Sequence, residues 1–158
     1  MTVRLEKAGL ADADEILRLQ VASFRPLLAR YGDEQTNPAN DRLADIVRRL
    51  QQPQTTYFFI VQADRRIGAI RVVFDAAAKR ARISPMFIAP PYQGQGHGQR
   101  AIELVEEEVG ALRWQLSTIL QEEGNCRFYE KLGYRRVGSE RRVNDKMTLV
   151  DYAKETPG

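Results

Sequence analysis

The sequence predicts an α+β fold in which helices pack on the faces of a mixed, mostly antiparallel sheet. Two observations lead to this class. Segments with helical spacing of apolar residues are interspersed with β-branched and aromatic runs, in the order strand, two helices, three strands, helix, strand, helix, two strands. The chain has 158 residues, of which 43% are hydrophobic and 28% charged, as is typical of a soluble globular domain. We therefore expect one domain over residues 1–158.

The N-terminal part is predicted to contain a short strand and two helices. The strand is expected at Val3–Lys7, and the first helix follows with Asp12 as its N-cap. Pro26 is expected to end or kink this helix, because an interior proline lacks a backbone donor and clashes with the preceding turn. A polar stretch, YGDEQTNPAN, then leads to Asn40, which we expect to cap a second helix in DRLADIVRRLQQ.

Three strands are expected next. TYFFIVQ and IGAIRVVFD flank the short turn ADRR and indicate an antiparallel hairpin, because both are rich in β-branched and aromatic residues. A third strand follows at about Ala81–Ala89. Pro85 lies inside it and cannot donate to the ladder, so we expect the strand to bend there.

The C-terminal part is predicted to contain two helices and three strands. Apolar residues at helical spacing oppose glutamates in AIELVEEEV, and Gly110 is well placed to end this helix. WQLSTIL indicates a strand, and NCRFYEKL a short helix that stops at Gly133. A final pair of strands is expected in YRRVG and KMTLVDYA.

Charge and composition argue against several function classes. The net charge is +3, and basic residues concentrate only at Lys79-Arg80-Arg82 and from Arg135 to Arg142. This is too weak to indicate nucleic-acid binding; such clusters are typical of solvated faces, although either could help to hold a phosphorylated ligand. One histidine, His97, and one cysteine, Cys126, supply no metal-ligand cluster. We therefore expect no metal.

The chain is expected to be a cytoplasmic protein that makes no membrane contact. No apolar run approaches membrane thickness, and the N-terminus carries charges where a secretory signal would need an apolar stretch. A single cysteine cannot form an internal disulfide, which agrees with a reducing compartment.

A glycine-rich loop, YQGQGHGQR, stands between the third expected strand and the helix that follows it. Glycine lets a backbone approach a ligand closely, and a helix that begins near His97 or Gly98 directs unpaired N–H groups into the loop. Such a loop suits an anionic group, typically phosphate, although a tight connection without a ligand fits the glycines equally well. The P-loop and the dinucleotide fingerprint are excluded, because Gly-Lys-Ser/Thr is absent and the glycines fall as G-x-G-x-G.

The pattern Gln93-x-x-Gly96-x-Gly98 resembles the Q/R-x-x-G-x-G/A pyrophosphate-binding motif of the GNAT N-acetyltransferase superfamily. MFIAPPYQGQGHG is similar to the strand, loop and helix unit of that family, and GNCRFYEKLGYRRVG to its later Asn…Tyr-x-x-x-Gly-aromatic segment. The resemblance covers Val3 to Tyr152, with its motifs in Met86–Gly138. It implies acetyl-coenzyme A as donor, an amine of a small molecule or peptide as acceptor, and it is compatible with a homodimer.

The resemblance also implies roles for individual residues. The pyrophosphate would rest on the loop amides, and the strand that carries Phe87 and Ile88 would diverge from Trp114–Leu120 to admit the pantetheine arm. Asn125 would hydrogen-bond the pantetheine side, although it stands closer to Tyr129 than is usual in the family. Tyr129 would stand beside the thioester sulfur as the catalytic residue. The expected coenzyme A-binding residues are Phe87, Ile88, Gln93, Gly94, Gln95, Gly96, His97, Gly98, Gln99 and Asn125.

Acetyl transfer requires a neutral amine, stabilisation of the thioester oxygen, and a hydrogen bond or proton for the departing thiolate. A strand amide near Phe87 or Ile88 is our candidate for the oxygen. A phenol has a pKa of about 10 and a thiol of about 8.5, so Tyr129 can assist the thiolate. The alternative for Tyr129 is a core tyrosine. Cys126 is interpreted as a plain helix cysteine, because no second histidine is present to activate it.

Several alternatives stay open at the level of the sequence. The general base is either water or one of four acidic residues, Asp33, Glu34, Glu122 and Glu123. A non-catalytic coenzyme A-binding sensor or scaffold and a nucleotide-binding partner protein are the competing functions. The acceptor pocket is expected to be built from the first two helices, YGDEQTNPAN and the chain end, which carry no signature of a particular acceptor.

Overall fold

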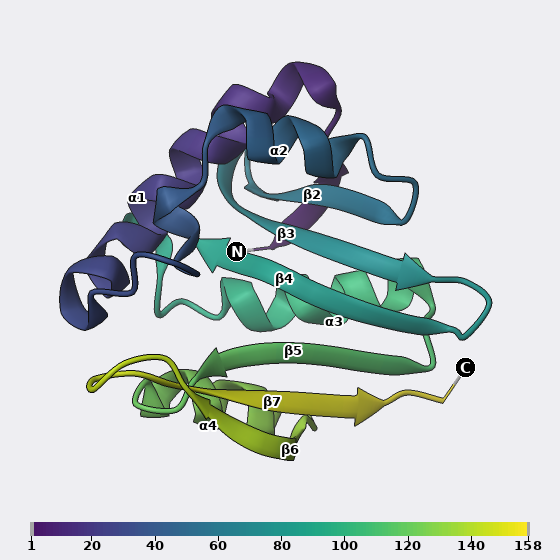
Figure 1. Cartoon of the computed structure of the whole chain (residues 1–158). Helices are drawn as coiled ribbons and strands as arrows, with labels where there is room; N and C mark the ends of the chain where they lie inside the picture. The colour runs from purple at the N-terminus through teal and green to yellow at the C-terminus, as the bar shows by residue number, and fades with distance from the viewer. Residues whose placement is uncertain (1, 158) are drawn as a thin grey trace.

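The computed structural model describes residues 2–157 as one mixed sheet with helices on both faces (Figure 1). The sheet has seven strands in the order β1-β2-β3-β4-β5-β7-β6. Its strands are β1 (Val3–Lys7), β2 (Thr55–Gln62), β3 (Arg65–Asp75), β4 (Arg80–Ile88), β5 (Arg113–Ile119), β6 (Arg135–Arg142) and β7 (Thr148–Glu155). The helices are α1 (Ala13–Tyr31), α2 (Leu43–Leu50), α3 (His97–Val109) and α4 (Glu123–Lys131). Within residues 2–157, only β4 and β5 pair in parallel, which confirms the expected mixed, mostly antiparallel sheet.

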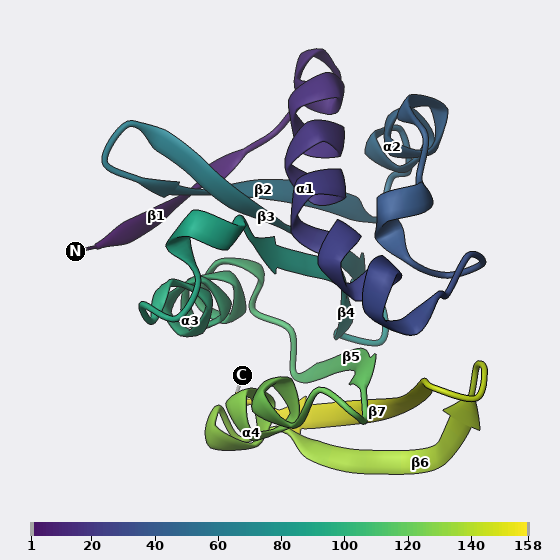
Figure 2. The same cartoon turned by 90° about the vertical axis from the view of Figure 1, so that its left-hand side faces the viewer.

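The two faces of the sheet are covered by different helices. Figure 2 shows α1 and α2 on one face, with α3 and α4 on the other. In β2, Tyr57 and Phe59 pack toward α1 and α2, whereas Phe58 and Ile60 belong to the core under α3. Successive residues of a strand point to opposite faces, so a strand between two helical layers reads as a continuous apolar run. The run TYFFIV has this property.

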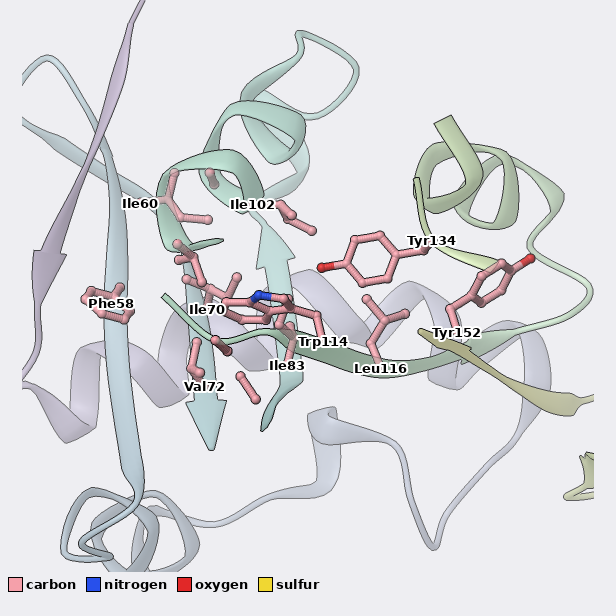
Figure 3. Close-up of a cluster of buried hydrophobic side chains, with 14 of the residues drawn as sticks. Phe58, Ile60, Ile70, Val72, Ile83, Ile102, Trp114, Leu116, Tyr134 and Tyr152 are labelled. Carbon is pink, nitrogen blue, oxygen red and sulfur yellow. The ribbon is translucent and has the colours of Figure 1, made fainter. Parts of the chain in front are cut away.

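The core on the α3 side surrounds Trp114, which is fully buried in β5 (Figure 3). Two buried tyrosines at its edge fix the neighbouring helices. Tyr152 of β7 donates to Glu130 of α4 at 2.7 Å, and Tyr134 donates to Glu106 of α3 at 2.8 Å. These bonds tie α4 to β7, and the segment after α4 to α3.

Pro26 was expected to end or kink the first helix, and the helix does not end there. α1 continues to Tyr31 and ends at Gly32, whose φ of +64° lets its N–H reach Leu28 O at 2.8 Å. A proline removes one donor from the helix, and Tyr31 beyond it is buried. Tertiary packing of the last turn therefore outweighs the local cost.

One of the two predicted N-caps is confirmed by position, since Asp12 is the N-cap residue of α1, and the other, Asn40, is wrong. Asp12 accepts from the N–H of Gly9 at 2.8 Å and closes a short 3-10 turn ahead of α1, to which it makes no side-chain cap bond. Asn40 lies in a second 3-10 turn, and α2 begins only at Leu43, where Asp45 accepts from the N–H of Arg42 at 2.8 Å. Asn40 is separated from α2, whose N-cap residue is Arg42.

The expected bend in β4 is confirmed. The register of β4 against β3 shifts between Ile70 and Val72, opposite the segment that contains Pro85. Pro85 cannot donate there, and Arg71 of β3 instead donates from Nη1 to the Ser84 carbonyl at 2.8 Å. The side chain of Arg71 therefore replaces a ladder bond and supports β4 at its bend.

No helix within residues 2–157 is long and apolar enough to cross a membrane.

Candidate functional site

The two central strands separate where the candidate site lies. β4 and β5 pair only from Arg80 to Arg82 and from Arg113 to Gln115. Beyond these rungs β4 continues to Ile88 and β5 to Ile119, and Figure 1 shows the strands moving apart toward their arrowheads. The backbone groups that β4 directs toward β5 are therefore left without a strand partner. This is the divergence that the sequence led us to expect.

The hydrogen-bond pattern shows which amide of β4 faces this gap. Ala89 donates to Ile67 O at 2.7 Å across β3 and β4, and bonding alternates along a strand, so Phe87 also faces β3. Ile88 then directs its N–H and C=O away from β3, and its carbonyl accepts from Gln93 Nε2 at 2.8 Å. Of the two amides considered from the sequence, Ile88 is the one that points into the gap.

Phe87 has a different position. Its side chain is buried on the α1 face and packs edge-to-face against Phe24, with ring centroids 5.7 Å apart. Its carbonyl lies so close to β3 that a Cβ added at Gly68 would stand 2.1 Å from the oxygen. Glycine at position 68 therefore permits the close approach that fixes the end of β4.

The glycine-rich loop joins β4 to α3, which begins at His97 as expected. Gly94 and Gly96 have φ of +74° and +84°, a conformation that favours glycine, and open space surrounds the position of a Cβ at both. Within residues 2–157, no amide from Gly94 to Gln99 donates a hydrogen bond. The loop thus presents a row of free donors at a helix N-terminus, as an anion site requires.

Gly98 and His97, at the start of α3, differ in their surroundings. A Cβ at Gly98 would lie 3.3 Å from the ring of Phe128 in α4, so this glycine lets the two helices approach. His97 is 5% exposed, and its Nε2 has no partner among the described protein atoms. The sequence placed His97 in the loop or at the helix start; its buried, unpartnered nitrogen is visible only in the structure.

Two cavities lie beside the end of β4 and share part of their lining. The loop cavity, of about 560 Å³, is lined by α1, the end of β4, the glycine-rich loop, the start of α3 and α4. All the residues predicted for coenzyme A border it except Gln95, whose side chain donates to Pro91 O at 3.3 Å. The strand cavity, of about 330 Å³, lies between β4 and β5 and is closed by the loop after α1 and by residues of β6 and β7.

Tyr129 lies where the two cavities join, since it lines both. Its ring packs edge-to-face against Phe128 at 5.0 Å and Tyr134 at 6.0 Å between centroids. Burial raises the pKa of Tyr129 to about 12. The phenol therefore stays protonated at neutral pH, and its hydroxyl accepts or donates no bond among the described residues.

Asn125 stands one helical turn before Tyr129 in α4 and lines both cavities as well. Residues four apart share a helix face, so the short spacing that separates this chain from the usual family pattern still places the two side chains on one side. Asn125 is exposed, which leaves its amide available to a ligand.

The acidic residues considered as bases are engaged or remote. Glu122 borders the loop cavity, but its carboxylate accepts from Tyr31 Oη at 2.5 Å and from Arg30 Nη1 at 2.6 Å. Asp33 borders the strand cavity and accepts from the amide of Thr36 at 3.0 Å. Glu34 and Glu123 line neither cavity.

Other groups named from the sequence contribute little chemistry. Cys126 is buried, with its Sγ 3.7 Å from Ile119 O, as expected of a plain helix cysteine. Among the described residues, no group of three or more His, Cys, Asp or Glu side chains is arranged to hold a metal.

Part of the strand cavity was not predicted from the sequence. Arg82, Ser117 and Arg141 line it, whereas α2, which we had expected to contribute, does not. The two arginines come from the two basic clusters noted in the sequence. The two basic clusters are visible in the sequence, but the sequence does not show that they lie close together in the fold.

The family of the chain follows from its match to the sequence model described as "Acetyltransferase (GNAT) domain", which covers residues 27–156. The chain belongs to the GNAT acetyltransferases, and it is an acyltransferase enzyme. No curated protein sequence matches it.

Solved structures agree with this family. The chain resembles an acetyltransferase from Thermus thermophilus with a TM-score of 0.77 and 22% identity, covering 99% of this chain and 98% of the other. It resembles the ribosomal-protein-S18-alanine N-acetyltransferase from Escherichia coli with a TM-score of 0.78 and 14% identity, covering 99% and 97%. Spermidine N-acetyltransferase from Vibrio cholerae, in complex with CoA and spermine, gives 0.77 and 15%, covering 97% and 95%. At these identities the likeness concerns the fold.

Proposed function

We propose that this chain is an N-acetyltransferase that transfers the acetyl group of acetyl-coenzyme A to an amine. The observation that carries the proposal is the position of Tyr129 at the junction of two cavities, one bordered by a glycine-rich anion loop and one between the separated strands. Binding of CoA by the structurally similar Vibrio cholerae enzyme agrees with it.

The donor is proposed to occupy the loop cavity. Its pyrophosphate would accept from the free amides between Gly94 and Gln99, which lie at the positive end of α3. The amide-rich pantetheine arm would pair with the backbone groups that β4 leaves free, and with the amide of Asn125. The buried Nε2 of His97 offers a further polar partner beside the loop.

The reaction would take place where the cavities join. The neutral amine attacks the thioester carbonyl carbon, a C–N bond forms, and negative charge develops on the carbonyl oxygen. The Ile88 amide points into the gap and is fixed before the reaction, so it is the donor that we assign to this oxygen. When the C–S bond breaks, the electron pair stays on sulfur, and Tyr129 provides the hydrogen bond or proton.

The amine must lose a proton, and we assign its removal to water. Asp33 and Glu122 are the acidic residues that line the cavities among the described residues, and both carboxylates are occupied by contacts within the protein. The strand cavity opens to solvent beside exposed arginines, so a proton can leave through water.

Two measurements test the proposal. Calorimetry with coenzyme A and with ATP should show binding of the first and much weaker binding of the second. Release of free thiol from acetyl-coenzyme A should then depend on an added amine, and mass spectrometry should show that amine to be acetylated. Coenzyme A binding without turnover on any amine would favour the sensor or scaffold function, and equal affinity for ATP would contradict the donor assignment.

A further inference from the structure

The strand cavity contains two arginines that meet at one hydroxyl group. Arg82 of β4 donates from Nη2 to Ser117 Oγ at 2.9 Å, and Arg141 of β6 donates from Nη2 to the same oxygen at 3.4 Å. All three residues line the cavity. Ser117 lies on β5, so three different strands bring these groups together at the end of the gap where β4 and β5 still pair.

One carboxylate accompanies these two cations. Asp151 of β7 accepts from Arg141 at 2.6 and 3.0 Å and from Ser117 Oγ at 2.6 Å. The hydrogen bond from Arg141 is the main cause that holds the pKa of Asp151 below its ordinary value, so this carboxylate is ionised at neutral pH. It pairs with Arg141 and also attracts Arg82, so the two cations and one carboxylate together keep one positive charge.

Arg82 is the cation that remains. It forms no ion pair with the described carboxylates, and its guanidinium carries five N–H donors, of which the bond to Ser117 uses one. The side chain is exposed to the cavity and to solvent. A guanidinium with free donors matches the geometry of a carboxylate or phosphate, which it can bind through two parallel hydrogen bonds.

The acidic residue of the strand cavity does not compensate this charge locally. Asp33 is 3% exposed, and its oxygens accept from the amides of Gln35 and Thr36 at 3.1 and 3.0 Å and from the Thr36 hydroxyl. These bonds belong to the turn after α1. The carboxylate is satisfied by its own loop, whereas the donors of Arg82 are not.

We infer that the acceptor is a small amine whose molecule also carries an anionic group, a carboxylate or a phosphate, and that Arg82 binds this group. The inference rests on the proposed function, because it assigns the strand cavity to the acceptor. A cavity of about 330 Å³ is at the lower end of the range for ligand sites, roughly 300–1,000 Å³, and suits a small molecule. Polyamines lack the anion that this charge requires.

The length of such an acceptor is bounded by β4. Arg82 stands at the closed end of the gap, and Met86, which lines both cavities, is four residues further along the strand. At about 3.3 Å per residue, the backbone between these two residues is roughly 13 Å long. The acceptor must be shorter than this, because the arginine side chain can reach along the gap toward it. An amine and an anionic group separated by several bonds would fit this span.

The test uses amines that differ in the anionic group alone. Glycine, β-alanine, 4-aminobutanoate and 6-aminohexanoate are compared with alkylamines of equal length, with 2-aminoethyl phosphate and with spermidine, by release of thiol from acetyl-coenzyme A. The best anionic amine should have a kcat/KM at least tenfold above that of its alkylamine counterpart. The aminoethyl phosphate arm shows whether phosphate or carboxylate is preferred.

Arg82→Gln should lower kcat/KM for the anionic amines about tenfold to a hundredfold, the range of a charge-assisted hydrogen bond, and leave the alkylamines unchanged. Arg80→Gln is the matched control: Arg80 is an exposed arginine on the same strand that lines neither cavity. It should change neither series. If Arg82→Gln lowers the melting temperature, Arg82→Lys replaces it and should retain part of the selectivity.

Failure of this inference can be distinguished from failure of the proposed function. Equal or better turnover of alkylamines or spermidine, or an equal loss in both series on Arg82→Gln, would overturn the anionic acceptor and leave an acetyltransferase. The same holds if no anionic amine is acetylated while coenzyme A binds. Absence of coenzyme A binding would contradict the donor assignment itself.

Discussion

Replacing Tyr129 with phenylalanine removes one hydroxyl and keeps a ring that packs against Phe128 and Tyr134. The hydroxyl makes no hydrogen bond to a described residue, so the variant should lose little stability. A general acid contributes about 10²–10⁴-fold, and a hundredfold loss corresponds to roughly 2.7 kcal/mol in the activation free energy. We therefore expect turnover to fall at least a hundredfold with unchanged coenzyme A affinity.

Tyr134→Phe is the matched control for this substitution. Tyr134 is buried and donates to the carboxylate of Glu106 at 2.8 Å, so its hydroxyl is a structural group outside both cavities. Loss of a hydrogen bond to a charged acceptor costs about 1.5–3 kcal/mol, and each kcal/mol lowers the melting temperature of a chain of this length by roughly 2–4 °C. Turnover at low temperature should stay near the wild-type value.

The assay measures thiol release at saturating acetyl-coenzyme A, with donor affinity from calorimetry and melting from circular dichroism. The expected result is a crossed pattern, in which Tyr129→Phe affects turnover and Tyr134→Phe affects melting. Wild-type turnover together with a lower melting temperature in Tyr129→Phe would refute our reasoning and make Tyr129 a core tyrosine.

Three further predictions follow from the loop, from β3 and from the pKa of Tyr129. Gly96→Val should weaken coenzyme A binding strongly in calorimetry. Gly110→Val is the control, because it places the same side chain at a similar positive φ at the other end of α3, and it should destabilise the protein without changing coenzyme A affinity. Equal coenzyme A affinities of the two variants would contradict the loop assignment. Gly68→Ala should destabilise by about 1–3 kcal/mol in urea unfolding, because its Cβ would stand 2.1 Å from Phe87 O, whereas Gly9→Ala, with open space around it, should have little effect. Tyr129 in the folded chain has a pKa of about 12, against an ordinary value of about 10. Its contribution to stability is therefore complete below pH 10 and is lost as the pH rises through 12. Tyr129→Phe should lose less stability than wild type over that interval, and equal losses in the two proteins would count against the raised pKa.

The sequence by itself determined the elements and the glycine-rich loop, because these depend on neighbouring residues. The apolar run TYFFIV indicates a strand buried on both faces, and the glycines between β4 and α3 allow the positive φ of Gly94 and Gly96. The spacing Gln93-x-x-Gly96-x-Gly98 carries the family resemblance, and the family match is in agreement with it. Backbone freedom and side-chain periodicity are local properties, so they can be predicted from the sequence alone.

Tertiary structure decided what depends on contacts between distant segments. Local rules placed Asn40 at a helix cap and allowed α1 to end at Pro26, but an additional 3-10 turn and the packing of Tyr31 outweighed them. The acidic candidates could not be ranked from the sequence, because the bonds that occupy Glu122 come from a distant helix, as its contact with Tyr31 across a separation of 91 residues shows.

The charge of the strand cavity also depends on contacts between distant segments. Arg82 and Arg141 belong to separate basic clusters, and they meet at Ser117 only because β7 and β6 follow β5 in the sheet. The order of strands is set by the burial of whole faces and by chain connections, which no single segment encodes. The glycine-rich loop could therefore be read from the sequence, whereas the charge of the strand cavity required the assembled sheet.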